Sequence, residues 1–280
     1  MPLSDEWRGF SNGGDAALIA ETVSSRIWKT RREDGSTAVV KELKPSGDVE
    51  DELRGAYFLA WRDGEGAVKL LGRDGLNMLI EYAGEEHLAD VVERQGDPAA
   101  TEIAAGVIAR LHAPSSRPAP AGLQPLRARF ASLFARADED GKDGRRSPYV
   151  GAARLAGRIL GDQRGVRPLH GDLHHDNILL SARGWLAIDP KGVLGDPAFD
   201  AANMFFNPLQ RDDLCRDAGR IAGMAAIFAR GMAIDPRRLL DFAVAYGCLS
   251  AAWHAEDGHG ADEARTLLVA EAIRAVRVSF

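Results

Sequence analysis

Two short stretches that lie close together place the strongest constraint on this chain. Residues 170–177 read HGDLHHDN, and Asp189 follows twelve residues after Asn177, within LAIDPKG. Between them the apolar runs 178–180 and 184–188 are separated by a short polar turn, which predicts a β-hairpin. The chain therefore has a loop rich in histidine and aspartate, then a hairpin, then another carboxylate where the hairpin ends.

One chemistry for such a loop is a metal site built from histidines. His170 and His174 are four residues apart, a spacing that faces one metal when both residues lie on a helix. Gly171 between them, Pro168 before them and the apolar run after them predict a loop between strands instead. No glutamate lies between the two histidines to act as a base. These features disfavour the metal interpretation.

The second chemistry is phosphoryl transfer. Protein-kinase catalytic loops read H-R-D-L-x-x-x-N, in which the aspartate is the base and the asparagine binds magnesium. Asp172 and Asn177 have this spacing, and Asp189 has the place of the aspartate whose magnesium bridges the phosphates. Magnesium prefers oxygen ligands of this kind. We therefore predict Asp172 as the catalytic base, with Asn177 and Asp189 as magnesium ligands.

A kinase-like site also requires a lysine on an earlier strand and a glutamate on the helix that follows it. Lys41 in AVVKEL fits the lysine. Glu52, eleven residues further on in a segment expected to be helical, is the predicted partner, and Glu50 is kept as an alternative. Glu81 and Ala83 follow a later strand, and their backbone groups are expected to bind adenine.

The 280 residues exceed the usual size of one domain, which predicts two lobes. Strand-like runs dominate early, and a 3.6-residue apolar period begins at residue 97. We expect an α+β protein in which residues 1–82 form a small β-rich nucleotide-binding lobe and residues 83–280 a larger helical lobe. The expected strands are 17–22, 26–31, 37–43, 67–71 and 77–81. The expected helices are 48–62, one starting at 97, 125–137, 148–160, 212–231, 236–255 and 262–276, with a solvated loop at 138–148.

The charge and composition of the chain limit the kinds of binding partner that we expect. A net charge of −6 and a pI near 5.7 argue against nucleic acid, and a mildly acidic surface suits a cationic small molecule. The apolar runs are too short for a membrane helix, and Cys215 and Cys248 are expected to be reduced, buried thiols. The first ten residues lack the pattern of a signal peptide. We expect a cytoplasmic monomer or weak dimer with no membrane partner.

The stretches HGDLHHDN, WLAIDPKG and GDPAFDAANMFFNP together resemble the aminoglycoside phosphotransferases. More narrowly, they resemble the streptomycin 6-kinase branch, grouped as aminoglycoside/hydroxyurea antibiotic-resistance kinases. SSRIWKTRREDGSTAVVKEL and the C-terminal SAAWHAEDG are also similar in order and spacing. The resemblance implies a protein-kinase-like two-lobed fold. It also implies magnesium-dependent transfer of phosphate from ATP (or GTP) to a hydroxyl of a small cationic antibiotic.

Two departures from protein kinases favour a constitutively assembled small-molecule kinase. Gly171 replaces the arginine that reads a phosphorylated activation loop, and no long segment follows Asp189. The first loop also lacks the glycines of G-x-G-x-x-G, so by the resemblance Ser24 or Ser25 is expected to meet the phosphates. His170 is expected to hydrogen-bond the loop backbone.

A polycationic sugar requires carboxylates, and an aromatic face also attracts a cation. The candidates for substrate contact are Asp176, Trp253, Glu256 and Asp257, with Asp196 and the pair at 262–263 as weaker ones. Asp200 is expected to cap a helix or brace the loop rather than touch the substrate.

Three functions remain open. The first is an antibiotic kinase of the streptomycin type, and the second is a kinase of the same fold acting on another hydroxylated metabolite. The third is an inactive nucleotide-binding protein. The complete set of Lys41, Asp172, Asn177 and Asp189 argues against the third.

Overall fold

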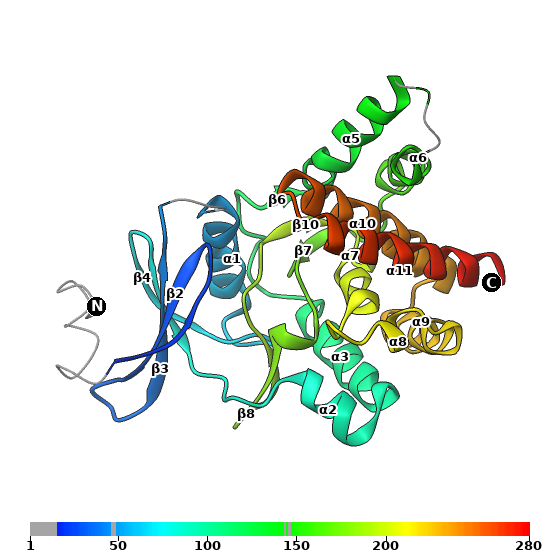
Figure 1. The fold of residues 1–280 in the computed structure, drawn as a ribbon. Coiled ribbons are helices and arrows are strands. Elements are labelled where there is room, and N and C mark those ends of the chain that lie inside the picture. Colours follow the sequence, from blue (N-terminus) through cyan, green and yellow to red (C-terminus); the bar gives the residue numbers. More distant parts are fainter. Residues whose placement is uncertain (1–15, 46–48, 143, 145–146) are drawn as a thin grey trace.

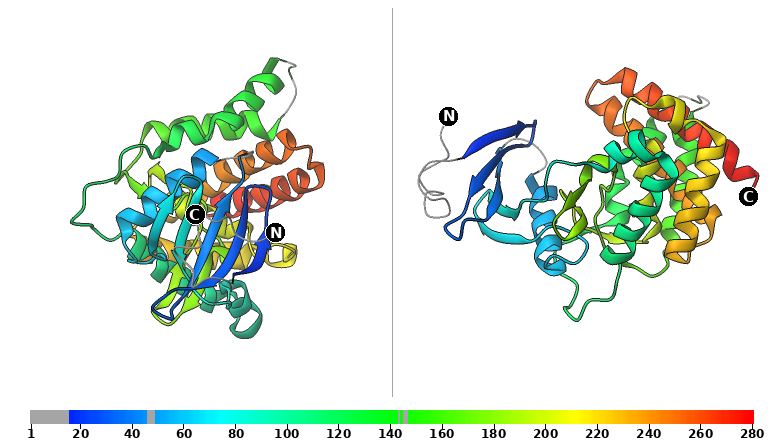
Figure 2. Two further views of the ribbon diagram at one scale, coloured as in Figure 1. Left: turned by 90° about the vertical axis from the view of Figure 1, so that its left-hand side faces the viewer. Right: turned by 90° about the horizontal axis from the view of Figure 1, so that it is seen from below.

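The computed structural model describes residues 16–45, 49–142, 144 and 147–280. The N-terminal stretch behind the signal-peptide prediction lies outside these residues. Figure 1 shows a small sheet with one helix at one end of the molecule and a larger group of helices at the other, and both views in Figure 2 show the same division. The β-rich part followed by a helical part is the fold class predicted from the sequence.

The N-terminal sheet is antiparallel and has the strand order β1-β2-β3-β5-β4. Its strands are β1 (Ala17–Glu21), β2 (Ser25–Arg31), β3 (Thr37–Leu43), β4 (Leu70–Asp74) and β5 (Asn77–Glu81). The change to helical structure follows β5, because the next element, α2 (Leu88–Gln95), is a helix.

The alternation of β3 decides where its lysine points. Successive side chains of a strand face opposite sides of the sheet. Val40 packs with Trp28 on one side, whereas Leu43 packs with Ala56 on the other side, where α1 (Val49–Arg62) lies. Lys41 shares the face of Leu43 and therefore points toward α1.

The other part of the molecule is built around α10 (Pro236–Glu256), which is buried along most of its length. It packs against neighbouring helices on several sides. A Cβ at Gly247 would lie 2.4 Å from the ring of Phe206, so this position must stay small. The other helices are α2 (Leu88–Gln95), α3 (Asp97–Leu111), α4 (Leu126–Arg129), α5 (Ala131–Lys142), α6 (Pro148–Gly161), α7 (Ala198–Ala202), α8 (Asp212–Cys215), α9 (Ala218–Met232) and α11 (Gly260–Val278).

Short strands lie between the two parts and carry the predicted site. A small sheet contains β6 (Gln124–Pro125), β10 (Val193–Gly195) and β7 (Arg167–Leu169), and β8 (Ile178–Ser181) pairs with β9 (Gly184–Ala187) in the predicted hairpin. The loop from β7 to β8 ends in a 3₁₀ turn, η2 (His175–Asn177), and a second one, η3 (Asn203–Phe206), follows α7. Within the described ranges, no helix has both the length and the apolar character needed to cross a membrane.

Several expected elements were wrong in their bounds. The strand expected at 67–71 starts only at Leu70, because Ala67 pairs with Ala187 of the hairpin instead. The helix expected at 125–137 is interrupted at Phe130, and α5 continues into the expected loop as far as Lys142.

Two further differences have local causes. The helix expected at 212–231 is divided, because the Asp217 side chain accepts a hydrogen bond from the Arg220 backbone amide and so starts α9 anew. Helix α2 was not predicted, although Leu88, Val91 and Val92 form a buried stripe at helical spacing.

Candidate active site

The loop that carries Asp172 is held from inside by His170. This histidine is fully buried; its Nε2 hydrogen-bonds the Ile188 carbonyl at 2.8 Å, and its Nδ1 accepts a hydrogen bond from the Asp172 backbone amide at 3.3 Å. Burial lowers the pKa of His170, which keeps the ring neutral and able to accept. The expected structural role of His170 is confirmed.

A buried carboxylate braces the same loop from the other side. Asp200 accepts hydrogen bonds from the backbone amides of His170 at 3.0 Å and Gly171 at 2.8 Å, and it pairs with His112 at 2.8 Å. Burial alone would raise the pKa of Asp200, but the His112 contact and these amides hold it below its ordinary value. The expected bracing role of Asp200 is confirmed.

Gly171 satisfies a backbone requirement as well as a packing one. Its φ is +85°, in the left-handed region, and a Cβ there would lie 2.6 Å from the Val193 side chain. An arginine at this position, as in protein kinases, would therefore be strained and would collide with β10.

The carboxylate of Asp172 is oriented by an amide that the sequence did not reveal. Nδ2 of Asn203 donates to Oδ1 of Asp172 at 3.0 Å, and Nδ2 of Asn177 donates to the Asp172 backbone carbonyl at 2.9 Å. Asn203 lies on η3, and nothing in the surrounding FDAANMFF pattern marks it in advance. One oxygen of Asp172 is thus fixed, which sets the direction of the carboxylate.

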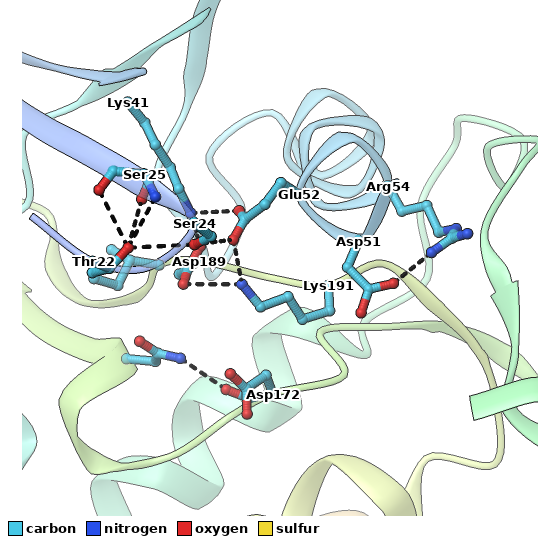
Figure 3. Close-up of polar contacts among 12 residues, drawn as sticks. Thr22, Ser24, Ser25, Lys41, Asp51, Glu52, Arg54, Asp172, Asp189 and Lys191 are labelled. Carbon is cyan, nitrogen blue, oxygen red and sulfur yellow. Dashed lines mark hydrogen bonds and ion pairs between the residues drawn. The ribbon is translucent and has the colours of Figure 1, made fainter. Parts of the chain in front are cut away.

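Four charged side chains meet where the first lobe contacts the hairpin (Figure 3). Nζ of Lys41 lies 2.5 Å from Oε2 of Glu52 and also pairs with Oδ1 of Asp189. Nζ of Lys191 lies 2.8 Å from Oε1 of Glu52 and 3.2 Å from Oδ2 of Asp189. Glu50 instead pairs with Arg54 at the surface of α1, so Glu52 is the partner of Lys41. Lys191 was not predicted, although its position two residues after Asp189 was visible in the sequence.

The electrostatics of this cluster favour the charged forms of Asp189 and Lys191. Burial alone would raise the pKa of Asp189, but Lys41 and Lys191 hold it well below its usual range. Burial likewise opposes the charge of Lys191, yet the carboxylates of Asp189, Glu52 and Asp172 raise its pKa well above the ordinary value. Both groups are therefore ionised at neutral pH.

Asp189 is also held in a conformation that non-glycine residues rarely adopt. Its φ is +57°, in a region that costs about 1–2 kcal/mol for an L-residue. The Ile188 amide donates to the Asn177 carbonyl at 2.9 Å, and the Lys191 amide donates to the His170 carbonyl at 2.7 Å. These bonds on both sides of Asp189 keep its carboxylate pointing into the cluster.

The donor set fits a hard divalent cation. Asp189 supplies an ionised carboxylate that now balances two ammonium groups, so the position already accommodates concentrated positive charge. The amide nitrogen of Asn177 is engaged with the Asp172 carbonyl, which leaves its oxygen as the atom able to act as a ligand. Oxygen donors of this type are those that magnesium prefers.

A cavity of about 610 Å³ lies between the sheet and the hairpin. The predicted nucleotide-binding residues all line it: Ser24, Ser25, Lys41, Glu52, Glu81 and Ala83, with Asn177 and Asp189 at one side. The Glu81 carboxylate pairs with Arg183, so at this position only the backbone can contact a ligand. Most of the other residues that line the cavity are apolar and come from both lobes.

Helix α1 is fitted closely onto the segment that follows Asp189. A Cβ at Gly55 would lie 1.9 Å from the Pro190 carbonyl oxygen, and a Cβ at Gly192 would lie 2.4 Å from the Arg54 carbonyl oxygen. The two backbones can approach this closely only because both positions are glycine. The contact holds Glu52 beside Asp189.

A second cavity, of about 820 Å³, lies on the other side of α1. Trp253, Glu256 and Asp257 line it from the end of α10, and Glu50 and Asp51 line it from α1. Three of the predicted substrate residues therefore share one cavity that has several carboxylates.

The other substrate candidates lie elsewhere. Asp176 is on η2 beside α2, where Nδ1 of His87 hydrogen-bonds its carbonyl at 2.9 Å. Asp196 is buried and pairs with Arg238. Glu263 accepts a hydrogen bond from Tyr149 at 2.6 Å, and Asp262 is exposed at the start of α11.

Solved structures with the same fold define the class of protein. Aminoglycoside phosphotransferase APH(4)-Ia, solved as a thermostable mutant with AMP-PNP and hygromycin B, has a TM-score of 0.64 and 16% identity, covering 95% of this chain and 94% of its own. Amicoumacin kinase hAmiN has a TM-score of 0.66 and 13% identity, covering 98% and 92%. The fold is that of the protein-kinase-like enzymes that phosphorylate small molecules.

The sequence identifies the family within that class. The aminoglycoside/hydroxyurea antibiotic resistance kinase family matches residues 14–258. A streptomycin 3''-kinase from Klebsiella pneumoniae is 38% identical over 259 residues, covering 91% of both chains. A streptomycin 6-kinase from Streptomyces griseus is 31% identical over 278 residues, covering 96% of this chain and 86% of the relative. This chain belongs to the aminoglycoside/hydroxyurea antibiotic resistance kinase family, and it is a small-molecule phosphotransferase.

Proposed function

We propose that this enzyme transfers the γ-phosphate of ATP, with magnesium, to a hydroxyl of a streptomycin-type aminoglycoside in the cytoplasm. The observation that carries the proposal is the convergence of Lys41, Glu52 and Asp189 in one cavity, beside a carboxylate, Asp172, held in place by Asn203. A protein that only bound nucleotide would not require an oriented base.

The chemistry follows from the positions of these groups. The substrate hydroxyl loses its proton to Asp172 as its oxygen forms a bond to the γ-phosphorus, and the bond from that phosphorus to the β-phosphate oxygen breaks to release ADP. Asn177 and Asp189 would hold the magnesium ion, which when bound would neutralise phosphate charge. Lys41, aligned by Glu52, binds the inner phosphates.

The acceptor is proposed to lie in the second cavity. Glu50, Asp51, Glu256 and Asp257 give this cavity an excess of carboxylates, which pair well with guanidinium and ammonium groups. The guanidinium of Arg129 lies 5.2 Å from the ring centroid of Trp253, which supports a contact between this ring and a cation of the same type.

A second candidate substrate is suggested by one relative. A hydroxyurea phosphotransferase from Kitasatospora aureofaciens is 32% identical over 260 residues, covering 86% of this chain and 69% of the relative. Hydroxyurea is small and uncharged, so it would bring no cation to Glu256 and Asp257, and we favour the cationic substrate.

The test is ATP turnover by the purified protein with magnesium, alone and with streptomycin, hydroxyurea or a panel of other aminoglycosides. We expect strong stimulation by streptomycin and a product heavier by one phosphate, whose phosphorylated position is then assigned by NMR. Stimulation by hydroxyurea alone would move the proposal to the second candidate. ATP binding without turnover on any of these acceptors would leave a kinase for another metabolite or an inactive nucleotide-binding protein, and no ATP binding would contradict the kinase function.

A further inference from the structure

Lys191 is the charged residue of the central cluster to which the kinase pattern gives no role. Its side chain is only 15% exposed, and its ammonium contacts Glu52 at 2.8 Å and Asp189 at 3.2 Å. The pattern already provides Lys41 as the partner of the same two carboxylates. The second lysine therefore needs an explanation of its own.

The two lysines divide the carboxylate oxygens between them. Lys41 takes Oε2 of Glu52 and Oδ1 of Asp189, whereas Lys191 takes Oε1 of Glu52 and Oδ2 of Asp189. In Figure 3 Lys41 reaches this pair from the strand, and Lys191 reaches it from the opposite side, where Asp172 lies. Lys191 is thus the ammonium group between the carboxylate expected to bind metal and the expected base.

The backbone of Lys191 is tied to the catalytic loop. Its amide donates to the His170 carbonyl at 2.7 Å, and the following residue, Gly192, is pressed against Arg54 of α1. The His170 carbonyl is only two residues before Asp172, so the ammonium of Lys191 and the base are positioned by the same piece of backbone.

We propose that Lys191 is a second phosphate-binding lysine, which contacts the γ-phosphoryl group while it moves to the acceptor. The inference rests on the proposed function. A divalent cation bound to Asp189 would leave Lys191 without one of its two partners. The γ-phosphate would then be the anion available to its ammonium on the side of Asp172. Lys191 forms and breaks no covalent bond; it balances charge that spreads over the γ-phosphate oxygens during transfer.

The alternative is that Lys191 only neutralises two buried carboxylates. Nucleotide affinities separate the two roles, because ADP lacks the γ-phosphate that AMP-PNP has. We would measure the dissociation constants of both nucleotides with magnesium by calorimetry for the wild type and Lys191→Met. The expected result is that the preference for AMP-PNP over ADP falls about tenfold, the loss typical of a charged hydrogen bond, while ADP binding changes little. Lys142→Met, which removes an exposed lysine of α5, is the control and should keep the wild-type preference.

Kinetics provide the second readout. A donor that acts on the transferring group is worth about 10²–10³-fold in kcat. We expect Lys191→Met to lose that much with a much smaller change in KM for ATP, and Lys191→Arg to recover part of it. If Lys191→Met shows no cooperative thermal transition, Lys191→Gln, which keeps a donor toward Glu52, takes its place.

The outcomes distinguish this inference from the function on which it rests. An unchanged ratio of the two affinities in the variant overturns the role of Lys191 and leaves the kinase function intact. A wild-type protein that binds neither nucleotide overturns both.

Discussion

The three histidines of the HGDLHHDN loop have three different surroundings. His170 is buried and hydrogen-bonded, and half-buried His174 accepts a hydrogen bond from the Asp176 amide at 3.3 Å. His175 is fully buried, and within the described part of the chain neither of its ring nitrogens has a hydrogen-bond partner. The loop is therefore built around histidines that fill space and fix the backbone, and Asp172 and Asn177 are the residues of this loop to which we assign the chemistry in our proposal.

The buried His175 should make the fold sensitive to acid. Burial, followed by the charge of Arg220, lowers its pKa from 6.5 to about 3. In the unfolded chain His175 therefore binds a proton below about pH 6.5. In the folded protein it binds one only below about pH 3. The free energy of unfolding therefore decreases as the pH falls through this interval. His175 alone accounts for a decrease of about 2 kcal/mol between pH 7 and pH 5.

We predict that His175→Leu reduces the acid-induced loss of unfolding free energy by about that 2 kcal/mol. Urea unfolding of both proteins at pH 7, 6 and 5 measures it. Replacement of the exposed His259 by leucine provides the comparison and should leave the pH dependence as in the wild type. If the unfolding free energy of His175→Leu decreased with falling pH as much as that of the wild type, the prediction would be contradicted.

Asp172 is the residue on which turnover should depend most steeply. Asp172→Asn keeps the size of the side chain but removes its ability to accept a proton, so we predict a loss of kcat of about 10²–10⁴-fold. Binding of AMP-PNP should remain close to that of the wild type. Product formation followed by mass spectrometry checks this, with Asp138→Asn on the exposed face of α5 as the matched substitution. Full turnover in Asp172→Asn would remove the proposed mechanism.

At the level of elements, the contact between α1 and the segment after Asp189 depends on two glycines. Gly55→Ala would place a methyl group 1.9 Å from the Pro190 carbonyl oxygen, so one backbone must move. We predict a loss of about 1–3 kcal/mol in unfolding free energy, the usual cost of overpacking, together with a lower kcat.

A second glycine gives the matched control for that change. Gly157 lies within α6, and a Cβ there would meet no atom within 4 Å. Gly157→Ala should therefore stabilise the protein by about 0.5–1 kcal/mol through helix propensity. Thermal unfolding of Gly55→Ala and Gly157→Ala tests this comparison. Equal changes in Tm for the two variants would show that the contact with Pro190 does not restrict α1.

Helices and strands with a clear apolar period were predictable from the sequence. Elements whose bounds depend on tertiary contacts were not. The strand at 37–43 and the hairpin after Asn177 follow their apolar patterns. The start of β4 was missed because the pairing of Ala67 with Ala187 joins segments far apart in the chain. A local sequence pattern does not reveal a contact of this kind.

The residues of the candidate active site show the same limit of prediction from sequence. Lys41, Glu52 and Asp189 were predictable because a fixed spacing and strand alternation bring them together. Asn203 and Lys191 were not assigned, because their roles depend on how η3 and the Asp189 segment fold back onto the loop.

In the whole molecule, α1 stands between the two cavities. Glu52, Gly55 and Ala56 line the nucleotide cavity, whereas Glu50 and Asp51 line the carboxylate-rich one. Asp51 also pairs with Arg129 of α4 at 2.8 Å, and residues of both lobes line the second cavity. Substrate and nucleotide are thereby expected on opposite sides of one helix.

This arrangement predicts separate effects on the two substrates. Glu256→Gln removes a carboxylate from the second cavity only, so we expect a rise of about tenfold or more in KM for streptomycin, the value of one charge-assisted hydrogen bond, with KM for ATP unchanged. Steady-state kinetics with each substrate varied in turn measure this. Glu271→Gln, on the exposed side of α11, should behave as the wild type. An equal rise in both KM values would mean that the cavities are not specific to one substrate each.

The glycine contact of α1 also bears on how the enzyme could be inhibited. A compound that acts by pushing this helix outward would have to separate backbones that touch at Gly55 and Gly192, without a side chain whose rotation could make room. An inhibitor of the first cavity would then have to fit that cavity as it stands, and resistance to it would have to arise from the residues that line the cavity.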